Sequence, residues 1–82
     1  MPRYYFDLYD GDTEPDTSGT ELPGLDEARL HAIRYAGEVL QRHPEWLDGK
    51  DLRVEVRNSA HLLLFTIIVL AISSAAAQAR VA

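Results

Sequence analysis

The first apolar pattern along the chain alternates with a period of two. Residues 3–9 read Arg-Tyr-Tyr-Phe-Asp-Leu-Tyr, and this aromatic-rich alternation predicts a strand. Its core face would carry Tyr4, Phe6 and Leu8, and its other face Tyr5, Asp7 and Tyr9. Asp10-Gly11 is a strong turn signal that ends the strand. The polar stretch 12–24 predicts a loop, with at most a short strand near residues 20–22.

The second pattern has the period of a helix with one apolar side. The helix can start at Gly24 or Asp26, and Pro44 stops it. The expected apolar side consists of Leu25, Ala28, Ala32, Ile33, Tyr35, Ala36, Val39 and Leu40. The expected polar side consists of Asp26, Glu27, His31, Arg34, Glu38 and Gln41. Because three of the apolar positions are alanines spaced by four residues, the helix backbone can approach a sheet closely.

Two further strands are predicted after the helix. The apolar pair Trp46-Leu47 lies in a polar connector that ends in the turn signal Asp48-Gly49-Lys50. Residues 52–57 alternate cleanly, with Leu52, Val54 and Val56 facing inward. Residues 58–61 are short enough for a hairpin into the apolar run 62–72.

This order of elements predicts an α+β fold of the type β-(β)-α-β-β, in which one amphipathic helix packs on a three- or four-stranded antiparallel sheet. The 82 residues have room for one core. We place a single domain at residues 1–72 and an alanine-rich tail at residues 73–82. The chain contains no cysteine, which excludes a disulfide framework, a thiolate zinc site and a cysteine nucleophile.

Charge is distributed unevenly along this acidic chain, whose formal net charge is -5. Residues 7–27 contain eight acidic side chains and no lysine or arginine, residues 28–57 are nearly balanced, and residues 58–79 carry no formal charge. The net charge argues against a surface that binds phosphate groups.

The N-terminal half resembles a known family. The chain opens with Met1-Pro2-Arg3-Tyr4-Tyr5-Phe6-Asp7-Leu8, and Asp10-Gly11, Asp16, Gly19 and Glu21-Leu22-Pro23 follow. This pattern is similar to the opening of a family of small, uncharacterised bacterial domains, and residues 52–56 resemble its penultimate strand. The resemblance covers about residues 1–70. It implies a domain of unknown function and supplies no catalytic or binding residues. The apolar run 62–72 departs from the family, whose last strand is more polar.

Three patterns could suggest chemistry. Acidic residues from Asp10 to Glu21 have the spacing of a calcium-binding loop, but Pro15 occupies the position that requires glycine. His31, His43 and His61 lack the spacing of a helical metal site. Ser59 and His61 have neither a nucleophile elbow nor an oxyanion loop beside them. We therefore expect no cofactor, no metal ion and no enzymatic activity.

The sheet face opposite the helix is the surface where nucleic acid could bind. Tyr5 and Tyr9 share that face and could stack on bases, with Arg53 and Arg57 nearby. Asp7 and Glu55 lie among the same positions, and the acidic loop would repel phosphate. A half-polar sheet face is the interpretation that these residues favour.

The apolar C-terminal strand needs cover on both faces. Its candidate interface residues are Phe65, Ile67, Val69, Leu70 and Ile72. Three arrangements would provide cover: a homodimer through paired strands or stacked sheets, a tail from residue 73 onward that folds back as a helix, or a membrane anchor at residues 62–79. The anchor is opposed by its minimal length and by Thr66, Ser73, Ser74 and Gln78.

The sequence therefore predicts a small, non-enzymatic interaction module that self-associates through its C-terminal strand. Alternatives are a nucleic-acid-linked regulatory protein and a membrane-tethered accessory protein. Residues 1–9 lack the apolar core of a signal peptide, so a cytoplasmic location is expected.

Overall fold

The computed structural model describes residues 1–47 and 51–78. Its main elements are a strand, a helix and a β-hairpin, in that order along the chain, and two short strands, a 3₁₀ turn and a short second helix accompany them. The elements in chain order are β1 (Arg3–Tyr9), β2 (Thr13–Glu14), β3 (Thr20–Glu21), α1 (Leu25–Arg42), a 3₁₀ turn (Pro44–Leu47), β4 (Asp51–Asn58), β5 (Leu63–Leu70) and α2 (Ala75–Gln78). The expected turn Asp48-Gly49-Lys50 lies outside the described residues.

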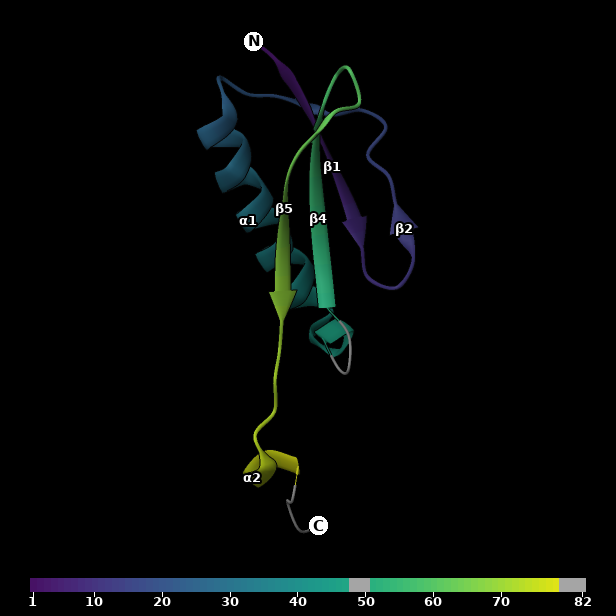
Figure 1. The fold of residues 1–82 in the computed structure, drawn as a ribbon, viewed down its shortest axis with the longest axis vertical. Helices are drawn as coiled ribbons and strands as arrows, with labels where there is room; N and C mark the ends of the chain where they lie inside the picture. The colour runs from purple at the N-terminus through teal and green to yellow at the C-terminus, as the bar shows by residue number, and fades with distance from the viewer. Residues whose placement is uncertain (48–50, 79–82) are drawn as a thin grey trace.

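One antiparallel sheet carries the fold, in the order β2-β1-β4-β5, and β3 pairs with the other end of β1 (Figure 1). Helix α1 packs against one face of this sheet. The predicted α+β class is therefore confirmed, and the short strand expected near residues 20–22 is β3. Strand β2 was not predicted from the sequence, and both of its residues are exposed.

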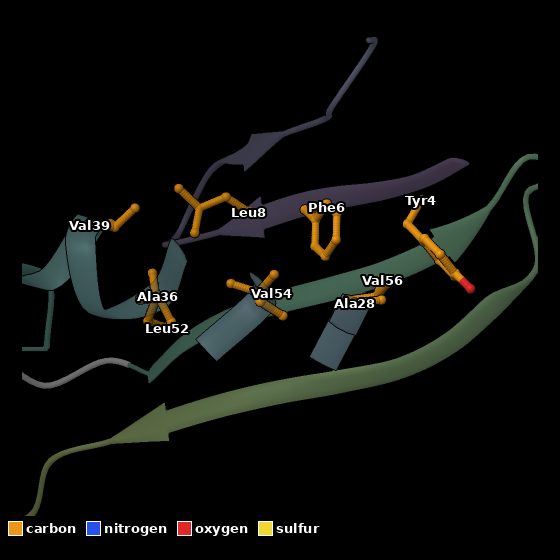
Figure 2. Close-up of a cluster of buried hydrophobic side chains, with 10 residues drawn as sticks. Tyr4, Phe6, Leu8, Ala28, Ala36, Val39, Leu52, Val54 and Val56 are labelled. Atoms are coloured by element: carbon orange, nitrogen blue, oxygen red, sulfur yellow. The ribbon is translucent and has the colours of Figure 1, made fainter. Parts of the chain in front are cut away.

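The core lies between α1 and the two central strands (Figure 2). Its members come from alternate positions of β1 and β4 and from one stripe of α1: Tyr4, Phe6, Leu8, Leu52, Val54, Val56, Ala28, Ala32, Ala36 and Val39. The inward faces predicted for both strands are confirmed. Because Ala28, Ala32 and Ala36 are almost fully buried, the small side chains bring the helix backbone close to the branched residues of β4.

The buried stripe of α1 is narrower than its apolar side. Leu25 and Ile33 were expected in the core, but both are exposed, because one helix on a narrow sheet contacts it along a single line of side chains. His31 was expected on the polar side. It is instead half-buried, and its ring lies 4.5 Å from the ring of Phe6 between centroids.

The C-terminal tail continues away from the domain. Helix α2 lies beyond the end of β5 and apart from the sheet (Figure 1), and residues 71–77 are exposed. The described part of the tail therefore does not fold back over the sheet. No helix among residues 1–47 and 51–78 is long and apolar enough to cross a membrane, and residues 63–70 of the run that was considered as an anchor form strand β5.

Candidate interaction surface

Strand β5 forms one edge of the sheet. It pairs with β4 from Leu70 opposite Asp51 to Leu63 opposite Arg57, with an irregularity beside Val56 and Arg57. Within the described chain no strand pairs with the other side of β5. The outer N–H and C=O groups of this strand therefore offer a site where another strand could add.

The five candidate interface residues divide into two groups. Phe65, Ile67 and Val69 lie opposite the buried residues of β4, on the side covered by α1, and they are only partly exposed. The guanidinium of Arg29 lies 5.4 Å from the ring centroid of Phe65 and covers part of it. Leu70 and Ile72 are 62% and 85% exposed.

Sequence reasoning placed Ile68 on the apolar strand but left it out of the candidate interface. In the structure Ile68 is 59% exposed and lies opposite Arg53, on the sheet face away from α1. We call that face the open face. The exposed residues Leu63, Leu64, Ile68, Leu70 and Ile72 are termed the β5 edge surface. None of them is charged, so approach of another apolar strand requires no desolvation of ions.

The opposite edge of the sheet is closed. Strand β2 pairs with the end of β1 and β3 pairs with its beginning. Between them the Asp16 carboxylate accepts a hydrogen bond from the Phe6 N–H at 3.1 Å. The same carboxylate accepts the N–H groups of Ser18 and Gly19, so that one side chain both fixes the loop and occupies the middle of the β1 edge.

Gly19 is required by this loop. Its φ of +73° lies in the left-handed region, and an added Cβ would lie 3.0 Å from the Tyr4 carbonyl oxygen and 2.8 Å from the Arg3 Cγ. Asp16 and Gly19, two residues of the pattern that resembles a family, therefore have structural roles at the closed edge.

Asp7 is buried on the open face, with 8% exposure. Its carboxylate accepts the Asp16 N–H at 2.9 Å and the Arg57 Nε–H at 3.1 Å. Arg57 also donates to Glu55, which lies directly opposite Asp7 in the ladder. The guanidinium thus separates two carboxylates that would otherwise repel each other across the strands. Alternation placed Asp7 on the correct face, but only the bonds to Asp16 and Arg57 explain its burial.

The arginines that could favour nucleic-acid binding already contact acidic or aromatic side chains of the same chain. Arg57 contacts Asp7 and Glu55. Arg53 lies 5.2 Å from the ring centroid of Tyr9 and 4.0 Å from the Asp51 carboxylate. Binding a phosphate backbone would require these cations to exchange partners, and the acidic residues would remain beside it.

A cleft of about 480 Å³ separates the acidic loop from α1, with Phe6, Glu14, Asp16, His31 and Tyr35 among its lining residues. Burial, together with the carboxylates of Glu14, Asp16 and Asp10, raises the pKa of Tyr35 above its usual value. No group of three or more potential metal ligands is present in the described ranges. Asp10 and Asp16 instead accept N–H groups two residues ahead, in Asx turns.

Comparison with protein-family models identifies the family of this chain. A family model described as "Domain of unknown function (DUF6894)" matches residues 3–71. The chain belongs to this family. The match includes the complete sheet and α1 and leaves the tail, residues 73–82, outside. Neither the comparison with curated proteins nor that with solved structures finds a match. The family assignment agrees with the domain of unknown function implied by the N-terminal pattern and gives this DUF6894 domain no assigned activity.

Proposed function

We propose that this DUF6894 domain is a small, non-enzymatic interaction module that self-associates through β5. The observation that carries the proposal is an uncharged edge strand with an open backbone and exposed apolar residues. Proteins ordinarily protect such edges with charges, proline, bulges or covering segments. Here β2, β3 and Asp16 protect the opposite edge, whereas β5 has no proline and no charged residue, and its one irregularity in pairing lies near its start, beside Arg57.

The charge distribution favours β5 as the place where a second copy joins. Each chain has a net charge of -5, and two such chains repel each other at long range. The acidic residues Asp10, Asp12, Glu14, Asp16 and Glu21 belong to the closed edge and its loops. Contact through β5 therefore keeps these five acidic groups of one copy far from those of the other. Because salt screens the remaining repulsion, self-association should strengthen as the salt concentration rises.

The test is the mass of the intact protein by light scattering over a dilution series, beside a version that ends at Ile72. Ile68→Lys places a charge on β5, and Leu30→Lys is the matched control because Leu30 is an exposed residue of α1. Wild type, the shortened chain and Leu30→Lys should associate, and Ile68→Lys should be monomeric. Circular dichroism checks that each variant is folded. A wild-type monomer at every concentration, or a dimer that Ile68→Lys leaves intact, would contradict the proposal.

A further inference from the structure

We infer that two copies of this chain join edge to edge, with β5 antiparallel to β5 of the partner around a two-fold axis at Ile67, to form one continuous sheet. This inference rests on the proposed self-association and selects among its geometries. The competing arrangement stacks the open faces of two copies on each other. The structure distinguishes the two by what each arrangement would bury.

Stacked open faces would bury ionic groups. On β1 and β4 the open face contains the linked side chains of Asp7, Glu55 and Arg57, together with Arg53. A two-fold stack would bring this set against a copy of itself and remove water from both. Apart from the aromatic rings of Tyr5 and Tyr9 on β1, the apolar residues of the open face belong to β5, chiefly Ile68 and Leu70. Edge pairing brings Ile68 and Leu70 beside the β5 strand of the partner and leaves the charged set in water.

The symmetry of a closed dimer fixes the strand direction. A two-fold axis perpendicular to the sheet makes the two β5 strands antiparallel and places both α1 helices on the same side. Residues directly opposite each other in an antiparallel pair share one face of the sheet. The helix-side residues of one β5 therefore meet the helix-side residues of the other.

The extent of the apolar run places the axis. Ile67 is the middle residue of the run 62–72. With the axis there, Phe65 lies opposite Val69 of the partner subunit, and Thr66 lies opposite Ile68 of the partner subunit. The run then overlaps its copy along its full length. Ile72 and Leu62, which are 85% and 61% exposed at opposite ends of the run, are brought beside each other across the axis.

Single cysteines test this register, because the chain has no cysteine of its own. Directly opposite residues in an antiparallel pair have Cα atoms about 4.5–5.5 Å apart, within the range of about 4.4–6.8 Å for a disulfide. Under mild oxidation, Ile67→Cys should form a covalent dimer on a non-reducing gel. Thr66→Cys and Ile68→Cys should not, since each is displaced from its own copy along the strand. The double variant Thr66→Cys/Ile68→Cys should cross-link, because these positions lie opposite each other. Thr13→Cys, on the closed edge, measures random collision.

The outcomes separate this inference from the proposed function. Thr66 and Ile68 both lie on the open face. Cross-linking of both Thr66→Cys and Ile68→Cys, each as a single variant, without Ile67→Cys would indicate stacked open faces and overturn the edge-to-edge arrangement while self-association stands. Cross-linking of only one of them without Ile67→Cys would move the axis to that residue and overturn the register. A wild-type monomer in light scattering would overturn both proposals. If Ile67→Cys fails to fold, the double variant decides, because the two single variants do not cross-link in the proposed register.

Discussion

The Asp16 carboxylate should contribute more to stability than any other exposed or half-exposed acid of the loop, and Asp16→Ala tests this. The substitution removes the acceptor for three backbone N–H groups, those of Phe6, Ser18 and Gly19, at 3.1, 3.1 and 3.0 Å. The loop would then lose its link to the β1 edge between the two short strands. We expect a lower free energy of unfolding without a change of fold.

The magnitude follows from the surroundings of each donor. The Phe6 N–H is partly buried, and leaving such a donor without a partner costs about 1–3 kcal/mol. The Ser18 N–H is exposed and the Gly19 N–H partly buried. Water can replace much of the hydrogen bonding of the Ser18 and Gly19 N–H groups, so the loss of both bonds adds only about 1 kcal/mol to the destabilisation. The expected total is about 2–4 kcal/mol. Asp16→Asn keeps one acceptor oxygen and should lose about half as much.

Urea unfolding, followed by circular dichroism at a fixed protein concentration, measures the loss. The control is Asp12→Ala, which removes the same charge from an exposed position of the same loop and should change stability by less than about 0.5 kcal/mol. The fixed concentration matters because self-association would add to the apparent stability. If Asp16→Ala and Asp12→Ala lost equal amounts, the stability would come from loop charge alone, and the proposed role of the Asp16 bonds would be refuted.

Three further predictions concern backbone strain and pH. Gly19→Ala should lower the free energy of unfolding, measured in urea, by about 2–3 kcal/mol, because the backbone has a left-handed φ and the Tyr4 carbonyl oxygen is close. Gly37→Ala is the control: no atom lies within 4 Å of the added Cβ, and this change should stabilise the helix. His61→Gly should stabilise by about 0.5–1 kcal/mol, because His61 has a φ of +63°, and an equal gain from His61→Ala would contradict this cause. The raised pKa of Tyr35 keeps its proton in the folded state after the unfolded chain has lost it, so its contribution is complete below about pH 10 and falls as pH rises further. Unfolding of Tyr35→Phe should accordingly depend less on pH than wild type in this range, and parallel pH profiles would refute it.

The periodic elements of this fold could be predicted from the sequence because burial imposes their periods. Alternation on β1 and β4 follows from a sheet covered on one face, and the inward residues Phe6, Val54 and Val56 are those expected. The helix was found for the same reason. Its exposed apolar residue Ile33 was misplaced, because a hydrophobic pattern shows which residues can be buried and does not show how wide the partner surface is.

The closed edge could not be predicted in the same way. Asp16 bonds to Phe6, ten residues earlier, and Asp7 bonds to Arg57, fifty residues later. Such contacts leave no period, and an acidic loop looks the same in sequence whether its carboxylates face water or cap a strand edge. Only the resemblance to a family singled out Asp7, Asp16 and Gly19 together. The structure gives the physical reason for these residue types at those positions.

The acidic loop and the apolar strand, which are separate features of the sequence, occupy opposite edges of one sheet. At one edge, carboxylates and two short strands satisfy the backbone of β1 and oppose further pairing by their charge. At the other, β5 has no charge and exposes residues such as Ile68 and Leu70. A sheet open at both edges could extend without limit, whereas a sheet with one closed edge completes its pairing with a single copy. The acidic edge would then limit the assembly to a dimer, and the apolar edge would form it.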